Sequence, residues 1–589
     1  MKIKKLFFAC LSFLMISVIS FSQDKRTLET KVADLLAQFP ATSLAYTDKL
    51  MEDMAGLGEA GLKQICDQII PAGTGDDTKA RFAIETFSRF ISGKGRETGR
   101  KIWEEICISF ASGKKDPGVK DFFIKQLQLI GSEKAAMALK IFIADKENCT
   151  SAISAITAIG GDIAEQIFSE SLTNTDLSCA AAVMNALASM RSKKAVKEFI
   201  YWSGVENPNT KASAYNALAM SGAAEALPVL LKAARSYGYR WERTGATASL
   251  INFANTAGLN GDIKTMDKIC KMLIKKCNDK LTLHNKAAAL KTYVSFHGTD
   301  AMSDILKAAG HPDARYRNAA IALTDMLKGS DVTGNWIEYF PKAIQEAKPE
   351  IIRMLGKRGD EKALGLISAS LNDPDSAVRK AASEAIAMLS GKNAVPELIG
   401  YMMKQDSDSD QEAVVSALKS IAGDKEISGL KDVLKNGSPA AKISAIELMA
   451  WNRNNDNFSE ILPLASSQDE KVKAAAFKAL KELAGEGDQE VLIGLLRSPG
   501  NTKFSSEIQQ AIAVSANKSA DTEKRSGQIL KAMDGSIDKK LLIPVLAKTG
   551  GRKALSAVLN EFENGNPEMR EVCFKALTSW NDYSASSAL

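Results

Sequence analysis

One short motif recurs along this chain and constrains its fold more than any other feature. The clearest copy is DPDSAVRKAASEAIAML, which begins at Asp373. The segments HPDARYRNAAIALTDML from His311 and SQDEKVKAAAFKALKEL from Ser467 repeat its order of turn, charged and apolar residues. Further copies start at Asn207 and Asn566. With the weaker copies, which start near Ser178, Thr244, Asn285, Gln411 and Lys442, the spacing between copies is mostly about 30 to 35 residues. A period of this length predicts an array of stacked units rather than several independent cores.

Each unit contains two segments with helical periodicity. In the best copy they cover residues 376–389 and 394–404, joined by the short turn SGKN. No segment alternates apolar and polar residues as a half-buried strand would. Aromatic residues make up only 6% of the chain while alanine is abundant, which also favours helices over sheets. The sequence therefore predicts an all-α fold, an α-solenoid of antiparallel helix pairs.

The residues of the motif have structural roles in such a helix. Asp373 is expected to cap the helix by accepting a backbone N–H, and Pro374 suits the first turn. Val378 begins the apolar stripe that the helix buries. Arg379 lies beside this stripe, where its stem can pack and its guanidinium can pair with a turn acid of an adjacent repeat.

The run DPDSAVRKAASEAIAMLSGKNAVPELI resembles a HEAT repeat of the compact kind also found in phycobilisome lyases. The resemblance is strongest over residues 350–500 and weakest before residue 150. It implies a curved superhelix (HEAT/armadillo-like) whose concave surface, formed by the second helices, binds proteins or other ligands. It does not imply an enzyme.

The N-terminus has the composition of a signal peptide. A basic start, MKIKK, is followed by an uncharged apolar run over residues 6–21, and Ser20 and Ser22 are small residues suited to cleavage. We expect a cleaved signal peptide at residues 1–22, export to the periplasm, outer membrane or exterior of a bacterium, and no later membrane span. Residues 23–150 are predicted to form an N-terminal helical region with degenerate repeats. Residues 151–589 are predicted to form the repeat array, with the last repeat incomplete.

Charge and cysteine usage narrow the classes of partner. Removal of Lys2, Lys4 and Lys5 with the signal peptide lowers the formal net charge from +6 to +3, which is too small for a nucleic-acid footprint. The seven cysteines that remain after Cys10 are scattered, odd in number and without C-x-x-C spacing. The pattern indicates neither a zinc site nor a disulfide framework, and it favours buried thiols.

No catalytic, cofactor or metal site is predicted. The chain lacks a G-x-S-x-G elbow, an H-E-x-x-H helix and an EF-hand loop. His284, His297 and His311 lack convincing further ligands, and His311 occupies the place of Asp373 in its own repeat. The acids of KQDSDSDQE are better explained as a solvated turn than as a calcium site.

One segment departs from the repeat, and it is the candidate binding surface. In ARSYGYRWERTG the rings and the cations are interleaved, and Tyr201 and Trp202 end a second helix one repeat earlier. Rings beside arginines are typical of protein interfaces and of sugar-stacking platforms. The alternative is that they fill an irregular junction between repeats. The candidate residues are Tyr201, Trp202, Arg235, Tyr237, Tyr239, Arg240, Trp241 and Arg243.

These observations favour a non-catalytic exported scaffold that binds a protein or glycan partner. An alternative is the repeat portion of a carbohydrate-active enzyme, since similar arrays accompany domains that resemble 3-keto-glycoside hydrolases. A lyase, by resemblance to phycobilisome lyases, is the third hypothesis, and the export signal argues against it.

Overall fold

The computed structural model describes residues 26–40, 43–113, 116–172, 177–534 and 539–588. Within these ranges every regular element is a helix and no strand is present, which confirms the predicted all-α fold class. The predicted signal peptide lies outside the described residues. None of the helices in the described part of the chain combines the length and apolar character needed to cross a membrane.

The chain divides into two compact units, Met1–Phe296 and His297–Leu589. The predicted boundary at residue 150 stays a prediction. In each unit the helices form two rows: first helices pack on the first helix of the next pair, as α11 does on α13 and α23 does on α25, while the second helices cover one side. This arrangement is an α-solenoid.

The helices of the first unit alternate between the two rows. The first row consists of α3 (Leu44–Gly56), α5 (Thr78–Ile91), α7 (Pro117–Ile130), α9 (Cys149–Ile159), α11 (Leu177–Ser189), α13 (Pro208–Ser221), α15 (Ala246–Leu259) and α17 (Leu283–His297). The second row consists of α2 (Leu28–Ala37), α4 (Gly58–Cys66), α6 (Glu97–Ser112), α8 (Glu133–Leu139), α10 (Gly161–Ser171), α12 (Val196–Trp202), α14 (Ala226–Ser236) and α16 (Ile263–Lys276).

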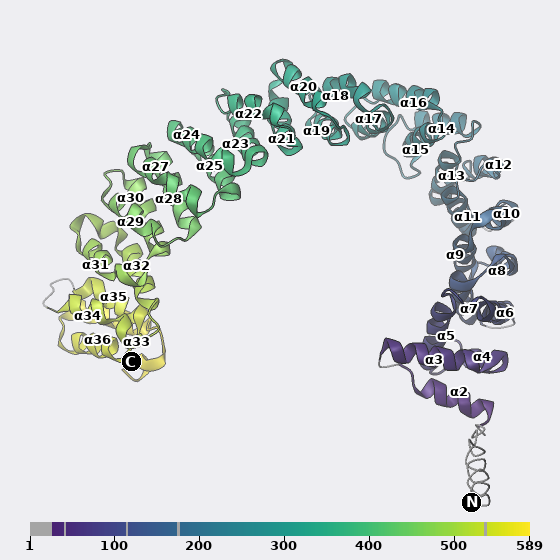
Figure 1. Ribbon diagram of the computed structural model, residues 1–589, viewed down its shortest axis with the longest axis horizontal. Coiled ribbons are helices and arrows are strands. Elements are labelled where there is room, and N and C mark those ends of the chain that lie inside the picture. Colours follow the sequence, from purple (N-terminus) through teal and green to yellow (C-terminus); the bar gives the residue numbers. More distant parts are fainter. Residues whose placement is uncertain (1–25, 41–42, 114–115, 173–176, 535–538, 589) are drawn as a thin grey trace, which may run out of the picture. The chain divides into compact units, whose positions relative to one another are not determined.

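The second unit repeats the pattern. Its first row consists of α19 (Ala314–Ala322), α21 (Lys348–Arg358), α23 (Ser376–Ser390), α25 (Asp408–Ile421), α28 (Pro439–Asn452), α30 (Glu470–Leu483), α32 (Ser505–Asn517), α35 (Lys539–Thr549) and α37 (Pro567–Thr578). Its second row consists of α18 (Met302–Ala309), α20 (Ser330–Tyr339), α22 (Leu364–Ser370), α24 (Val395–Lys404), α27 (Lys431–Asn436), α29 (Asn457–Ile461), α31 (Gln489–Arg497), α34 (Gly527–Met533) and α36 (Arg552–Asn564). In Figure 1, α22, α24 and α27 lie on one side of α23, α25 and α28.

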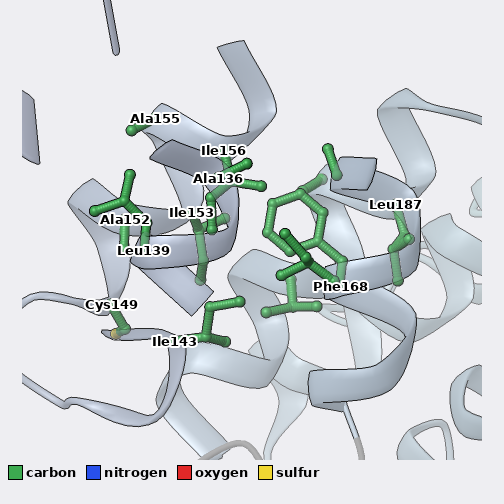
Figure 2. Packing of buried hydrophobic residues seen from close by; sticks show 14 of the residues in the cluster. Ala136, Leu139, Ile143, Cys149, Ala152, Ile153, Ala155, Ile156, Phe168 and Leu187 are labelled. Carbon is green, nitrogen blue, oxygen red and sulfur yellow. The ribbon is translucent and has the colours of Figure 1, made fainter. Parts of the chain in front are cut away.

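The core runs continuously between the rows. In the first unit, Figure 2 shows Phe168 of α10 among side chains from α8, α9 and α11. Small residues such as Ala136, Ala152 and Ala155 are fully buried there, which lets the helices approach closely. In the second unit, Val378 is likewise buried in the predicted apolar stripe of α23. Each repeat therefore gains its core only by contact with its neighbours.

The predicted cap of the motif is wrong by two residues. Helix α23 begins after Asp375, whose side chain accepts the N–H of Ala377 at 2.8 Å. Asp373 instead accepts the N–H of Asp375 at 2.9 Å, which forms a local turn and delays the start of the helix, so Pro374 lies before it. In the repeat at His311, the imidazole Nδ1 accepts the N–H of Asp313 in the same way, so this histidine does serve as a turn residue.

A half-buried cation links successive repeats. Arg379 forms a two-point ion pair with Asp410 in the first turn of α25, with N–O distances of 3.0 and 2.8 Å. Its guanidinium also donates to the carbonyl oxygens of Asp373 and Pro374, at 2.9 Å each. The pairing expected between Arg379 and an acid of the adjacent repeat is therefore present. Asp410 belongs to this link rather than to an ion-binding loop.

The same position carries a cation in other repeats. Arg317 pairs with Glu350 of α21 and donates to the carbonyl oxygen of His311 at 3.0 Å. Lys473 donates to the carbonyl oxygen of Gly500 at 2.7 Å. Arg379 and Arg317 thus join their own entry turns to the following repeat, and Lys473 reaches the following repeat.

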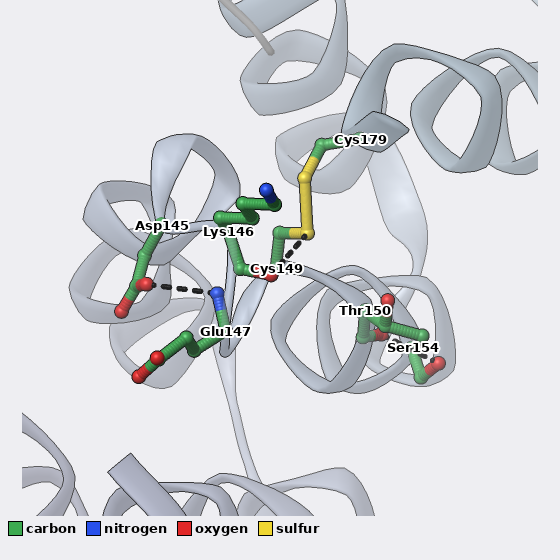
Figure 3. Close-up of a disulfide and its surroundings, with 7 residues drawn as sticks. All are labelled: Asp145, Lys146, Glu147, Cys149, Thr150, Ser154 and Cys179. Atoms are coloured by element: carbon green, nitrogen blue, oxygen red, sulfur yellow. Dashed lines mark hydrogen bonds between the residues drawn. A yellow bond between two sulfur atoms is a disulfide. The ribbon is translucent and has the colours of Figure 1, made fainter. Parts of the chain in front are cut away.

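One disulfide corrects the expectation that the cysteines form none. Cys149, at the start of α9, is bonded to Cys179, in the first turn of α11, with a Cα–Cα distance of 6.2 Å (Figure 3). The two residues are 30 positions apart, which is one repeat, so the stacking of α9 on α11 brings them together. The five other cysteines of the described chain are free and buried: Cys66, Cys107, Cys270, Cys277 and Cys573.

Candidate functional site

The candidate site is built on the loop between α14 and α15, which we call the aromatic loop, residues 237–245. Helix α14 ends in a Schellman motif, in which the N–H of Tyr239 donates to the carbonyl of Ala234 and that of Gly238 to Arg235, both at 3.0 Å. This motif needs a left-handed residue after the helix, and Gly238 supplies it with φ +61°. Tyr239 also has positive φ, +58°, so the chain turns sharply away from α14.

The far end of the aromatic loop is also fixed. The carboxylate of Glu242 accepts the N–H groups of Thr244 and Ala246 and the hydroxyl of Thr244, and so caps the start of α15. The carbonyl oxygen of Tyr239 accepts a hydrogen bond from the side-chain amide of Asn285 on α17 at 2.8 Å. The aromatic loop is therefore held at both ends and in the middle, and its outward side chains have a defined position.

The rings predicted to bind a partner separate into exposed and buried ones. Trp241 is 78% exposed, Tyr201 is 72% exposed and Tyr237 is 39% exposed. Tyr239 is half-buried and packs against the core of the first unit. Trp202 is only 8% exposed and its ring meets that of Tyr201 edge to face at 5.5 Å. The prediction that Trp202 contacts a partner is wrong, because this ring is part of the core between helices.

The arginines of the segment have different surroundings. Arg240 pairs with Asp279, beyond α16, at 3.3 Å, and both side chains are about half exposed. Arg243 donates to the side-chain oxygen of Asn209 on α13 at 3.5 Å. These two contacts tie the aromatic loop to the neighbouring repeats. Arg235 makes no hydrogen bond or ion pair with any described residue through its side chain, and it lines a groove.

This groove between α14 and α16 was missed by the sequence reasoning. It has a volume of about 380 Å³ and is lined mainly by apolar side chains. Its lining residues are Leu227, Leu231, Arg235, Tyr239, Lys268, Ile269, Met272 and Lys276. The signal was present in the sequence, because Leu227, Leu231 and Arg235 recur at i+4 on α14, as do Lys268, Met272 and Lys276 on α16. The same spacing is equally typical of an apolar stripe that is buried in the core, so the sequence alone does not reveal the groove.

Buried titratable side chains lie on the neighbouring helices α13 and α16. Burial raises the pKa of the Cys270 thiol to about 12 and that of Cys277 to about 11, so neither is an activated nucleophile. Burial likewise raises the pKa of Tyr215 to about 12. No group of three or more His, Cys, Asp or Glu side chains in the described ranges could hold a metal ion. Another aromatic-rich segment, NWIEYFP from Asn335, places Trp336 in the core, where its Nε1 donates to the Thr324 hydroxyl at 3.1 Å.

Comparison with known proteins identifies the repeats. A family model described as HEAT repeats matches residues 165–251 and 341–419, and no curated protein matches the chain. Among solved structures, yeast importin-beta (Kap95p) is 12% identical with a TM-score of 0.40, covering 94% of this chain and 88% of that chain. Kap121p is also 12% identical, with a TM-score of 0.41, covering 94% and 73%. Human deoxyhypusine hydroxylase in complex with glycerol is 15% identical with a TM-score of 0.18, covering 49% and 96%.

These structural similarities are too weak to carry an argument about function. The family match and the paired helices agree with each other, since the two matched segments cover α10 to α15 and α21 to α25. Residues 165–251 and 341–419 are therefore HEAT repeats within an α-solenoid.

Proposed function

We propose that this protein is an exported, non-catalytic HEAT-repeat scaffold that binds a protein partner at the aromatic loop. The surface involved is that of the second helices, which the HEAT resemblance expects to be concave. The observation that carries the proposal is the exposure of Trp241 on a loop whose backbone is fixed by hydrogen bonds at both ends. A loop that only joined two helices would not need a large ring held in solvent.

Exposed, preorganised aromatic residues beside arginines favour binding. Tryptophan, tyrosine and arginine are enriched among the residues that dominate the binding energy of protein interfaces, and the two aromatic residues bury a large area for few rotatable bonds. Trp241, Tyr201 and Tyr237 remain exposed in the described structure, while Arg235 keeps its guanidinium without a described partner. The ordering cost of binding is low, because the loop is already fixed.

Two observations support export. Residues 1–22 have the composition of a signal peptide. The Cys149–Cys179 disulfide fits an oxidising compartment, in which such bonds form and persist. N-terminal sequencing of the protein from its native cells is expected to start at Gln23, and a chain that starts at Met1 would contradict export.

A glycan partner is the second candidate, because Trp241 is accessible enough to stack on a sugar. The protein and glycan candidates differ in what the Trp241 ring contacts, so one experiment can distinguish them. The double variant Trp241→Ala/Tyr201→Ala is compared with wild type for capture of proteins from the native cell envelope and for binding to a glycan array. The matched control is Tyr583→Ala, which removes an exposed ring from the second unit.

We expect the double variant to lose at least tenfold of its protein capture while its melting temperature stays the same. The control variant is expected to capture as wild type does. Loss of glycan binding with intact protein capture would favour the glycan candidate. A large fall in melting temperature with unaltered capture would overturn the proposal and make these rings structural.

A further inference from the structure

The groove between α14 and α16 has an apolar floor that the fold does not fill. Leu227 and Leu231 of α14 face Ile269 and Met272 of α16 across it. Both helices pack against α15, which forms their common support. Leu227, Leu231 and Met272 remain half-buried, so part of their apolar surface is in contact with water. Covering this surface is favourable, by about 25 cal/mol for each Å² removed from water.

Positive charge surrounds this floor. Arg235, Lys268 and Lys276 line the groove, and none of the three side chains has a hydrogen bond or an ion pair to a residue in the described ranges. They come from both helices: Arg235 lies in the last turn of α14 and Lys276 in the last turn of α16, while Lys268 lies about two turns earlier on α16.

The acids nearby are already engaged. Asp267 pairs with Lys271 at 3.1 Å, on a different face of α16. Asp279 pairs with Arg240, and the side chain of Asp262 accepts the N–H of Thr265 to cap α16 at 3.0 Å. The three lining cations are therefore not neutralised by these carboxylates, and the groove is complementary to an apolar ligand that carries negative charge.

We propose that the groove binds an acidic amphipathic helix of a protein partner. The inference rests on the proposed function, and it names the chemistry of the segment that the partner supplies. Apolar side chains at i, i+3 or i+4, and i+7 of the partner helix lie on the floor between α14 and α16. Aspartate or glutamate on its flanks meets Arg235, Lys268 and Lys276.

The geometry favours a helix over other acidic ligands. The groove runs between two roughly parallel second-row helices, and in this fold such helices already pack side by side, as α12 does on α14. A volume of about 380 Å³ is near the lower limit for a pocket that encloses a whole ligand, but it accepts a few side chains from a helix lying above it. Met272 lies in the floor, and a methionine adapts its shape to different apolar partners.

Continuity with the aromatic loop adds a second argument. Tyr239 belongs both to the groove and to the aromatic loop, and the exposed Trp241 follows it by two residues. A partner helix in the groove thus reaches a ring of the kind that anchors protein interfaces. An anionic lipid would use the cations and the floor without requiring this ring.

The test selects the ligand rather than assuming it. A library of random 14-residue peptides is displayed on phage and selected on the full-length protein, and the enriched peptide is synthesised and titrated by fluorescence anisotropy. We expect enriched sequences with an apolar stripe at i, i+4 and i+7 flanked by acids, and binding that weakens as salt is raised. The charge-reversal variant Lys268→Glu/Lys276→Glu is expected to weaken binding at least tenfold.

The control variant carries the same change of charge elsewhere. Lys101→Glu/Lys197→Glu alters exposed lysines of α6 and α12 that do not line the groove, and it is expected to bind as wild type does. Leu231→Asp places a charge in the apolar floor and is expected to weaken binding, whereas Leu231→Met keeps the floor apolar and is expected to retain binding. Peptides without acids, equal weakening by both charge variants, or no enrichment would each overturn the inference.

Two further outcomes distinguish the acidic-helix proposal from lipid binding and from the proposed function itself. Tight binding to phosphatidylglycerol vesicles, lost in Lys268→Glu/Lys276→Glu while no acidic helix binds, would assign the groove to lipid and overturn the proposal. Envelope capture that depends on Trp241 but is unaffected by the groove variant would leave the proposed function intact and remove only the acidic helix.

Discussion

The ion pair between Arg379 and Asp410 offers a test of how the repeats are held together. Asp410 is 1% exposed and Arg379 is 18% exposed, so Asp410→Ala leaves a largely buried guanidinium without its counter-charge. Removal of one partner of a buried pair costs roughly 3 to 5 kcal/mol. Arg379 keeps two carbonyl acceptors and some contact with water, which places the expected loss near the lower limit, about 3 kcal/mol.

The assay must resolve single repeats, because a long solenoid does not unfold as one unit. Hydrogen–deuterium exchange followed by mass spectrometry reports the local opening of each helix. A loss of about 3 kcal/mol corresponds to a roughly 100-fold increase in the open fraction. We expect this increase in α23 and α25, and unchanged exchange in α11 and α13 of the first unit.

The control is a pair of the same kind at the surface. Lys419 of α25 reaches Glu447 of α28, and their side chains are 31% and 56% exposed. Lys419→Ala is therefore expected to cost at most about 1 kcal/mol. Equal effects of Asp410→Ala and Lys419→Ala, or an effect of Asp410→Ala spread evenly over both units, would refute the reasoning.

Three further perturbations follow from the contacts described above. Replacement of Cys149 and Cys179 by serine removes a disulfide that links residues 30 positions apart, and it should cost about 3 to 4 kcal/mol of local stability. The loss is measured as faster hydrogen–deuterium exchange in α9 and α11. Unchanged exchange there would contradict the presence of the disulfide. Hydrogen bonds from Arg315 lower the pKa of Asp313 to about 2, so its stabilising effect on α19 is complete above pH about 4 and is lost as the pH falls toward 2. Asp313→Asn should remove that acid sensitivity, and an unaltered pH profile of exchange in α19 would count against the assignment. Burial raises the pKa values of Cys270 and Cys277, so native protein at pH 8 should not react rapidly with a thiol reagent. Denatured protein should show the five free thiols of the described chain. Fast labelling of the native protein would show these thiols to be accessible.

The periodicity of the sequence predicts the fold closely, because a repeated apolar stripe has only one way to be buried. The predicted segments 376–389 and 394–404 correspond to α23, Ser376–Ser390, and α24, Val395–Lys404. The start of α23 was misplaced because Asp373 and Asp375 are both suitable caps, and only the backbone turn selects between them. Local sequence does not specify that turn.

The candidate site was only partly predictable, since exposure depends on what lies opposite a residue. The break in the repeat corresponds to the aromatic loop, where Tyr237 and Trp241 are exposed, and binding there stays a prediction. Burial of Trp202 beside the exposed Tyr201 could not be predicted, because the two are adjacent in sequence and differ only in the side of α12 that they occupy. The groove and the disulfide needed the stacking of repeats, which brings distant residues together.

Site-specific photo-crosslinking in the native cells tests the central claim most directly. A photoreactive phenylalanine analogue replaces Trp241 in one experiment and Tyr583, the exposed ring in the second unit, in another. The proposal predicts a discrete crosslinked protein from position 241, absent from position 583 and reduced by Lys268→Glu/Lys276→Glu. Identical products from both positions, or no protein product from position 241, would contradict a partner-binding surface at the aromatic loop.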